Sequence, residues 1–565
     1  MSNPSPAQYL HTSGATNPVW THHQPYTSHP HFPQLTTSLT TPSTSPTIVI
    51  IGAGIAGIQT AYELIRRNNN NYRIILLEAR DVLSGESGRT SGHLTNDLDD
   101  GYVQIAKKHG EKGAKLAAES HTWARDRVEE VVRELGIECE FRRVRAYDVS
   151  QYRRGEEGHE REMGELRGEA EMQRGLGLET RFEENLTVRG WNGKPDQRGG
   201  MISENQATFH PTQYLAGVLA WLKTQPNFSC YTRTRVTNIQ EQGIEVLGLG
   251  HKSVVVTTEA GHTIHADYAI EATCIPLQKL SVVAELEFFR SYCIAVRVPR
   301  GSVEDCLLYD NAEAYKYVRL TACDEKDDYL VVGGCDHKVG QAETLPRFEE
   351  LEKWTRERFP QAGKTDYNWS GQIFEPVDYM AFIGKNQGSD KIFIVTGDSG
   401  DGLTHGVLAG RLIADEIEGK PNEWASLYNP KRLGSIAKSL PTMIQHDVQI
   451  NMQYKRFLQS DISDIEDLAP GCGGVLNSGT GKPLAVYKDN SGEVSTYSAL
   501  CPHMKGVVCW NHAEKSFDCP VHGSRFSANG ICLSGPAKMN LSPADKKAAA
   551  EQEHDDSPAG VRSGP

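Results

Sequence analysis

The chain has 565 residues, and at roughly 150 residues per domain this length predicts about two to four domains. Lysine and arginine number 59 against 73 aspartates and glutamates, so the net charge is −14. This acidic balance argues against a nucleic-acid-binding protein, which would present a basic face. No apolar run is long enough for a membrane span, and 12 cysteines are too few for a secreted disulfide scaffold. A cytoplasmic protein is expected.

Both ends of the chain have the composition of disordered tails. Residues 1–46 contain no Lys, Arg, Asp or Glu and are rich in Ser, Thr, Pro and His. Such a segment buries too little apolar surface to offset the entropy lost on ordering. Residues 544–565 are mostly Ala, Gly, Pro and charged residues, and they predict a second disordered tail.

A βαβ unit follows the first tail. Residues 47–51 and 73–77 are short apolar runs typical of strands buried on both faces, and residues 55–65 carry a helical period. The turn Gly-Ala-Gly-Ile-Ala-Gly at 52–57 joins the first strand to the helix. Its glycines permit a tight turn, a close approach to a pyrophosphate and close helix–strand packing. Glu78 ends the second strand, where a carboxylate can accept from ribose hydroxyls. The unit therefore predicts a dinucleotide site.

Two further loops favour FAD over NAD. Residues 85–95 read Gly-Glu-Ser-Gly-Arg-Thr-Ser-Gly-His-Leu-Thr, a run of small residues that can lie along an extended cofactor. A predicted strand at 391–395 runs into Thr-Gly-Asp-Ser-Gly-Asp-Gly at 396–402, and a helix follows. The N-terminus of that helix would stabilise the negative charge of a reduced flavin.

With these loops, residues 47 to 420 resemble the D-amino-acid-oxidase-like family of FAD-dependent oxidoreductases. The segments His-Pro-Thr-Gln-Tyr at 210–214 and Glu-Pro-Val-Asp at 375–378 add to the resemblance. It implies an α/β, Rossmann-like FAD-binding domain with an inserted mixed β-sheet substrate domain, and oxidation of amines, amino acids or alcohols. The FAD contacts that it implies are Gly52, Ala53, Gly54, Ile55, Ala56, Gly57, Glu78, Arg89, Thr90, Ser91, Val236, Ala272, Thr273, Gly397, Asp398, Gly402, Leu403 and Thr404.

Catalytic residues are weakly defined, because this chemistry depends on placing a C–H bond over the flavin rather than on one obligatory base. Arg297 could pair with a substrate carboxylate, and the alternative is a solvated strand arginine. Tyr379 could line the site, and the alternative is a core tyrosine. Some family members attach FAD covalently through a loop His or Cys, so His93 is either such an attachment point or a non-covalent loop histidine.

A second cofactor signature lies near the C-terminus. Cys501-Pro-His503 and Cys519-Pro-Val-His522 are separated by residues 504–518. The order Cys, His, Cys, His lets one iron take both cysteines and the other iron both histidines, which is the ligand set of a Rieske [2Fe–2S] cluster. The alternative is a Cys₂His₂ zinc site, in which two cysteines usually precede two histidines. The succession of short predicted strands and glycine turns from about residue 462 predicts a small all-β domain.

This C-terminal segment resembles Rieske domains, with two informative departures. In the high-potential Rieske proteins of respiratory complexes, the positions of Gly506 and Val521 are cysteines joined as a disulfide. Those proteins also have a tyrosine in place of Phe526, whose hydroxyl bonds a ligand sulfur, while Ser524 retains the other such bond. The resemblance implies a cluster of intermediate or low potential. Cys509 and Cys532 are expected to be packed thiols.

The two cofactors together predict a converter between two-electron and one-electron chemistry. We expect a flavin domain at 47–420, a helical connector at 421–461 with a break at Pro441, and a Rieske domain at 462–543. A small organic substrate would reduce FAD, and the cluster would pass electrons singly to an acceptor, which could be a protein. The alternative is an electron-transfer protein that relays electrons to a partner enzyme.

Overall fold

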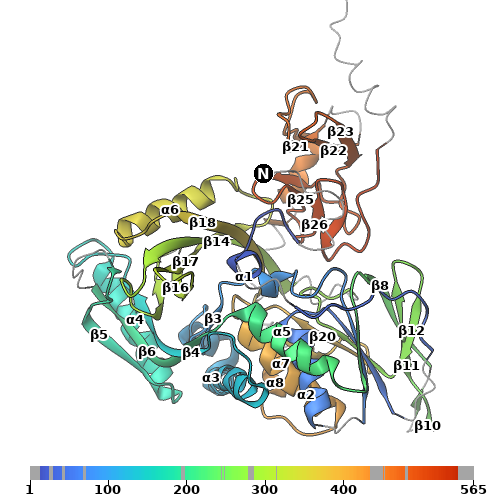
Figure 1. Ribbon diagram of the computed structural model, residues 1–565, viewed down its shortest axis with the longest axis horizontal. Helices are drawn as coiled ribbons and strands as arrows, with labels where there is room; N and C mark the ends of the chain where they lie inside the picture. Colours follow the sequence, from blue (N-terminus) through green and yellow to red (C-terminus); the bar gives the residue numbers. More distant parts are fainter. Residues whose placement is uncertain are drawn as a thin grey trace, which may run out of the picture.

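The computed structural model describes residues 13–23, 29–40, 45–67, 71–191, 198–243, 245–246, 249–277, 285–312, 315–432, 439, 449–450, 452–477 and 482–544. Figure 1 shows the small C-terminal strands above the larger body of the molecule. Within the described residues, no helix is both long and apolar enough to cross a bilayer.

A six-stranded sheet carries the predicted βαβ unit. Its order is β19 (Phe382–Lys385), β20 (Ile392–Thr396), β13 (Tyr268–Glu271), β1 (Thr47–Ile51), β2 (Arg73–Leu77) and β7 (Phe228–Tyr231). All neighbours are parallel except β19, which lies antiparallel at the edge. Every residue of β1 is buried, as its continuous apolar run predicts.

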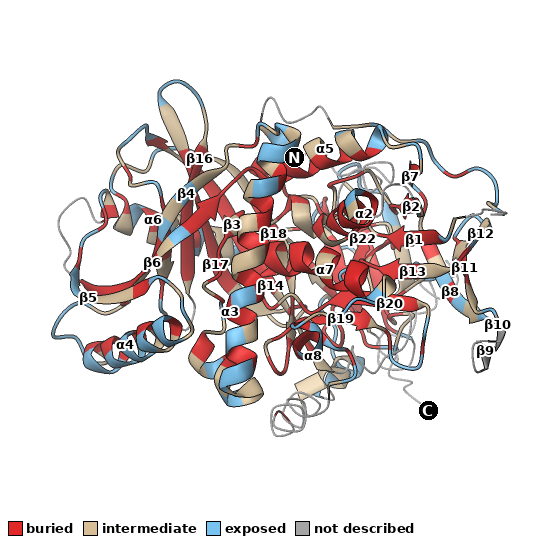
Figure 2. Cartoon of the chain, turned by 90° about the horizontal axis from the view of Figure 1, so that it is seen from below, coloured by how far each residue is buried: buried red, intermediate tan, exposed pale blue. Residues whose placement is uncertain are grey.

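Helices cover one face of this sheet and a smaller sheet covers the other. The helices are α2 (Ile55–Arg67), α3 (Tyr102–Leu135), α5 (Pro211–Lys223) and α7 (Gly402–Ile417). The second layer consists of β8 (Val236–Gln242), β11 (Ser253–Thr258) and β12 (Thr263–Ala266), which pack on alternate residues of β1 and β2. The short hairpin β9 (Glu245–Val246) and β10 (Leu249–Gly250) lies beside them. Figure 2 shows α7 and the central strands buried between these layers.

The inserted domain is a nine-stranded mixed sheet, as expected. Its order is β18 (Thr365–Pro376), β14 (Leu286–Pro299), β17 (Asp327–Lys338), β16 (Lys316–Ala322), β15 (Cys306–Asp310), β4 (Arg142–Val149), β6 (Arg198–Thr208) and β3 (His93–Leu94), with β5 (Thr180–Leu186) also on β6. Helices α4 (His159–Gly175) and α6 (Pro346–Arg358) pack on it. Its strands β3 and β18 carry residues of the large cavity described below.

The C-terminal domain contains two small antiparallel sheets. One consists of β21 (Cys472–Leu476), β22 (Leu484–Lys488) and β23 (Val494–Ser498). The other consists of β24 (Cys509–Asn511), β25 (Ser516–Asp518), β26 (Arg525–Ser527) and β27 (Cys532–Ser534). A separate core of buried residues, including both predicted ligand cysteines, holds the domain together.

The expectation of a disordered N-terminal tail is wrong for residues 13–23 and 29–40. They include the short helix α1 (Val19–His22), and Trp20 is fully buried. The indole packs edge-on against His210 and Trp369, and its Nε1 donates to Thr90 O at 2.6 Å. A few buried apolar side chains order this uncharged segment. A prediction from overall composition does not detect such individual side chains. Residues 1–12, 24–28 and 41–44 and the tail after residue 544 lie outside the described residues.

The predicted helical connector is described only in part. Its described portion includes the helix α8 (Ala425–Tyr428) and the 3₁₀ turn η5 (Tyr454–Leu458). Residues 433–438, 440–448 and 451 lie outside the described residues, and the expected break at Pro441 falls among them.

Candidate cofactor sites

The turn at 52–57 has the geometry that its glycines predict. Gly52 has a φ of +106°, and a Cβ there would overlap the carbonyl oxygen of Ala272. A Cβ at Gly57 would overlap Gly52 O, so this glycine is needed for helix–strand packing. Gly54 instead faces the large cavity, where a Cβ would meet only Ser87. The first and third glycines therefore shape the turn, and the second leaves backbone accessible to a ligand.

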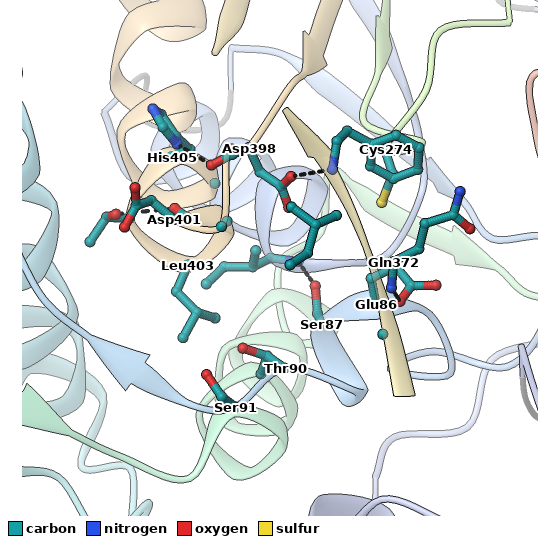
Figure 3. A pocket seen from close by; sticks show the side chains of 18 of the residues that line it. Glu86, Ser87, Thr90, Ser91, Cys274, Gln372, Asp398, Asp401, Leu403 and His405 are labelled. Carbon is teal, nitrogen blue, oxygen red and sulfur yellow. Dashed lines mark hydrogen bonds between the residues drawn. The ribbon is translucent and has the colours of Figure 1, made fainter. Parts of the chain in front are cut away.

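Glu78 supports this turn from the end of β2. Its Oε2 accepts a hydrogen bond from Ala53 N at 2.9 Å, and its Oε1 accepts from Arg80 N at 2.9 Å. Ser87, on the 3₁₀ turn η2 (Glu86–Gly88), accepts from Ile55 N at 3.0 Å (Figure 3). The carboxylate thus holds the glycine turn and keeps further lone pairs that a ribose hydroxyl could use.

The turn opens into a cavity of about 1360 Å³, part of it open to solvent. The cavity wall contains twelve of the predicted FAD contacts, namely Gly54, Ile55, Ala56, Arg89, Thr90, Ser91, Ala272, Gly397, Asp398, Gly402, Leu403 and Thr404. Segments from α2, the 85–95 loop, the 396–402 loop and α7 therefore meet at this one cavity.

Six of the predicted FAD contacts are not on the cavity wall: Gly52, Ala53, Gly57, Glu78, Val236 and Thr273. The first four form or support the glycine turn behind it. Val236 is buried in β8, within the core between β8 and the large sheet. Thr273 Oγ1 donates to Ile275 O at 2.6 Å, and the next residue, Cys274, reaches the cavity instead.

Two carboxylates stand where α7 begins. Asp398 and Asp401 line the cavity, and Asp398 Oδ1 accepts from Phe374 N at 3.1 Å (Figure 3). Burial raises the pKa of Asp398 to about 6 and that of Asp401 well above its usual value. The N-terminus of α7 therefore faces the cavity. Two acids lie beside it, and burial disfavours the ionised form of both.

Sequence reasoning missed the substrate-domain wall of the cavity. That wall includes Gln372 and Phe374 from β18, Tyr309 from β15, Tyr317 from β16 and Tyr315, which directly precedes β16. These residues are far apart in sequence and share no local motif. The one available signal was the Glu-Pro-Val-Asp segment that ends β18.

The two weak catalytic candidates lie elsewhere. Arg297 pairs with Asp324, Asp327 and Asp366, at 2.6, 3.1 and 2.6 Å, on the far part of β14. These three carboxylates hold the guanidinium, which favours the alternative of a strand arginine over pairing with a substrate carboxylate. Tyr379 has a φ of +70° and packs beside Lys108, away from the cavity wall.

His93 lines the cavity from β3. Its Nδ1 lies 3.0 Å from Ser91 Oγ and its Nε2 lies 3.2 Å from Val318 O. Burial, together with the charge of Arg319, lowers its pKa to about 3, so the ring is neutral near pH 7. Both nitrogens have partners within the protein, and a non-covalent loop histidine remains the prediction, with covalent attachment as the alternative.

In the C-terminal domain, the four predicted ligands converge in two pairs. The thiols of Cys501 and Cys519 are hydrogen-bonded to each other, which lowers the pKa of Cys501 to about 7. The rings of His503 and His522 lie 5.0 Å apart. Among the described residues, no three His, Cys, Asp or Glu side chains share one metal-binding point. The pairing of two thiols and of two imidazoles fits two irons with two protein ligands each.

The loops around these ligands show both differences from the high-potential Rieske proteins that the sequence indicates. Gly506 and Val521 are in contact, so the valine side chain fills the position of the missing disulfide. Ser524 bonds to Cys501, and the fully buried Phe526 has no hydroxyl to offer. Cys509 and Cys532 are buried free thiols, as expected.

A network of buried charges joins the two domains. Glu514, on the turn between β24 and β25, is bound by Arg89 at 2.7 Å and by Arg290 at 3.1 Å. Thr16 of the N-terminal segment donates to the same carboxylate at 2.6 Å. Burial alone would raise the pKa of Glu514, but the surrounding arginines outweigh it and hold the pKa well below its usual value. The 85–95 loop, β14 and the N-terminal segment therefore all contact this domain through one side chain.

A dinucleotide-type βαβ fold with a second glycine loop, joined to an all-β domain with paired Cys and His ligands, defines a flavin and iron–sulfur oxidoreductase. Residues 47–416 match the FAD dependent oxidoreductase family, and residues 463–545 match the Rieske [2Fe-2S] domain. The chain belongs to the FAD dependent oxidoreductase family, and its C-terminal part is a Rieske domain. It is an oxidoreductase that binds FAD and a [2Fe–2S] cluster.

Two relatives and one solved structure illustrate the likeness to known proteins. The Rieske 2Fe-2S iron-sulfur protein YhfW of Bacillus subtilis is 27% identical over 502 residues, covering 88% of this chain and 93% of that protein. The oxidoreductase OrdL of Haemophilus influenzae is 25% identical over 427 residues, covering 73% and 91%. Glycine oxidase from Geobacillus kaustophilus has the same fold over 69% of this chain and all of its own, with a TM-score of 0.55 at 18% identity.

Proposed function

We propose that this oxidoreductase oxidises a small organic substrate, an amine, amino acid or alcohol, at FAD and passes the electrons through the Rieske cluster to a one-electron acceptor. We assign the flavin unit to residues 47–420, the connector to 421–461 and the cluster unit to 462–543. Bound FAD accepts two electrons as a hydride equivalent, and a [2Fe–2S] cluster carries one. Substrate would occupy the part of the cavity beside the substrate-domain strands.

The residues of the turn and the two loops would hold FAD by its phosphates and ribose. The N-terminus of α2 would meet the pyrophosphate at Gly54, and Glu78 would accept from a ribose hydroxyl. Arg89, Thr90 and Ser91 would lie along the cofactor, and the start of α7 would face the flavin end. Cys501 and Cys519 would bind one iron of the cluster, and His503 and His522 the other.

The observation that carries this proposal is the short path of contacts between the cavity wall and the cluster ligand His522. Gln372 lines the cavity, and its Nε2 donates to Gly523 O, beside His522, at 2.9 Å. Phe374 also lines the cavity and packs on Phe288, whose ring lies 6.0 Å from that of His522. Two side-chain layers or fewer therefore separate the cavity from a cluster ligand. A cluster with an unrelated role would not need this placement.

The test is anaerobic mixing of the holoenzyme with a panel of amines, amino acids and alcohols. We expect one class to bleach the flavin, and cluster reduction to follow at a rate independent of protein concentration. A Cys501→Ser variant should still be bleached but should stall with one-electron acceptors. The matched control is Cys509→Ser, which changes a buried thiol outside the ligand set. If the Cys501→Ser variant turns over such acceptors at the unaltered rate, the cluster is not the route.

A further inference from the structure

The cavity continues into a second, acidic one that the predicted cofactor contacts do not touch. This side cavity encloses about 580 Å³, part of it open to solvent. It adjoins the large cavity at Asp99, Tyr309 and Tyr315, which line both. Its wall also includes Asp97, Asp148 and Asp310. Four carboxyl groups thus surround a space that opens from the large cavity beside the strands of the substrate domain.

No basic side chain balances this charge within the two cavities, as far as the described wall residues go. The side cavity has no Lys, Arg or His on its wall, and the large one has Arg89, His93 and His405. Arg89 is committed to Glu514 and to Ser370 O, at 2.7 Å each. His93 and His405 have pKa values lowered by burial to about 3 and about 4, so both are neutral near pH 7.

The protein satisfies the acids of the side cavity only in part. Asp97 accepts from Gln173 and Ser203 and shares a hydrogen bond with Asp148, and Asp310 accepts from Ala312 N and Trp354. Asp148 Oδ2 and Tyr309 Oη are buried atoms without a hydrogen-bond partner among the described residues. Burial raises the pKa of Asp97 to about 6 and, with the charge of Asp336, that of Asp99 to about 7. Buried acceptors without donors are costly, and a cation with several N–H donors would satisfy them. The phenol rings of Tyr309 and Tyr315 offer faces to the same cation.

We propose that the substrate is an amine with a second positive charge a short chain away, whose far ammonium binds among Asp97, Asp99 and Asp148 while its reacting end lies in the large cavity. This inference rests on the proposed function and specifies its substrate. An α-amino acid fits poorly, because its carboxylate would meet Asp99, Asp398 and Asp401 with no available cation. The glycine oxidase likeness concerns the fold alone.

The reaction of such an amine balances with FAD as oxidant. The carbon beside the reacting nitrogen loses a hydride and the ammonium loses a proton, both to FAD, which leaves an iminium ion. Water then adds, and the products are an aldehyde and an ammonium ion. Two one-electron acceptors take the two electrons from the reduced flavin, and two protons are released.

Binding can be measured without turnover on the holoenzyme held reduced by dithionite under anaerobic conditions, because a reduced flavin takes no hydride. We would titrate it calorimetrically with 1,4-diaminobutane, n-butylamine, 4-aminobutanoate and glycine. The diamine should bind roughly 10-fold to 100-fold more tightly than n-butylamine, as expected for added charge-assisted hydrogen bonds. The two carboxylates should bind more weakly than n-butylamine.

An Asp148→Asn variant should weaken the diamine by roughly 10-fold and leave n-butylamine unchanged, since only the far ammonium reaches Asp148. Glu171→Gln, on the exposed surface of α4, is the matched control and should change neither. Equal affinity for the diamine and n-butylamine, or tighter binding of either carboxylate, would overturn the proposal. So would equal weakening of both amines in Asp148→Asn.

The ligand series on the unaltered protein decides the matter even if Asp148→Asn does not fold. The outcome is also separate from that of the proposed function, because the titration requires no electron transfer to the cluster. If the protein binds the diamine but a variant without the cluster still reduces acceptors, the substrate proposal stands and the electron-relay proposal fails. If the cluster relays electrons from a different class of substrate, the electron-relay proposal stands and the diamine proposal fails.

Discussion

Replacing Glu514 by Gln should loosen the Rieske domain from the flavin domain. The carboxylate is fully buried and accepts hydrogen bonds from Thr16, Arg89, Arg290 and Ser370. Glutamine keeps the volume but removes the charge, and its amide group would point N–H donors at guanidinium groups. Arg525 would still pair with Asp518, whereas the buried Arg89 and Arg290 would lose the carboxylate that they both contact.

The size of the effect follows from the uncompensated charge. Removing one partner of a buried ion pair typically costs about 3–5 kcal/mol. For a domain of this size, each kcal/mol shifts the unfolding midpoint by roughly 4–8 °C, so a fall of at least about 10 °C is expected. The depressed pKa of Glu514 adds a pH signature in the unaltered protein. This stabilisation is present above the ordinary glutamate pKa of about 4.3 and is lost as pH falls through the lower folded pKa.

The assay is thermal loss of the cluster's visible circular dichroism, with flavin fluorescence followed in the same sample. Glu466→Gln, an exposed acid of the same domain, is the matched control and should leave the midpoint unchanged. The variant should lose its cluster signal well before flavin release, because the contact lies at the Rieske side of the flavin cavity. A midpoint equal to that of the control would refute the view that this buried carboxylate joins the domains.

Three further changes test separate parts of the structure. Gly57→Ala should abolish FAD binding, since the added methyl overlaps Gly52 O, and a full flavin-to-protein ratio after purification would count against the role given to this turn. Trp20→Ala should cost about 3–5 kcal/mol in urea denaturation, because it empties a fully buried site between the N-terminal segment and the body, whereas a change under about 1 kcal/mol would mean that this segment is dispensable. Phe526→Tyr should raise the cluster's reduction potential in an EPR-monitored titration by supplying a hydroxyl beside the ligand cysteines, and an unchanged or lower potential would contradict the reading of this position.

The cofactor sites could be predicted from the sequence because their residues lie close together in it. Three short motifs each predict their own local geometry: the glycine turn at 52–57 with Glu78, the Cys-X-His loop at 501–503 and the Cys-X-X-His loop at 519–522. The cavity wall formed by Gln372, Phe374 and Tyr309 could not be predicted, since it depends on how strands of the nine-stranded sheet fall in register. Trp20 was missed for a related reason: its partners, His210 and Trp369, are remote in sequence.

The surroundings of the Arg297 and Val236 side chains could not be predicted from the sequence. A strand arginine can face a substrate or a cluster of acids, and only the fold brings Asp324, Asp327 and Asp366 to it. Val236 belongs to the layer behind the sheet, where its side chain fills a core shared with β1 and β2. Local pattern defines the strand in both cases, and the tertiary contacts define the role.

The most direct test of the central claim is flash photoreduction of the bound flavin under anaerobic conditions, which needs no knowledge of the substrate. Flavin absorbance and the cluster's visible signal would be followed together over a range of protein concentrations. The contacts of Gln372 with Gly523 and of Phe288 with His522 lead us to expect that the cluster is reduced as the flavin is reoxidised, at one rate independent of concentration. A rate that rises in proportion to protein concentration, or a cluster that stays oxidised, would contradict transfer within one molecule.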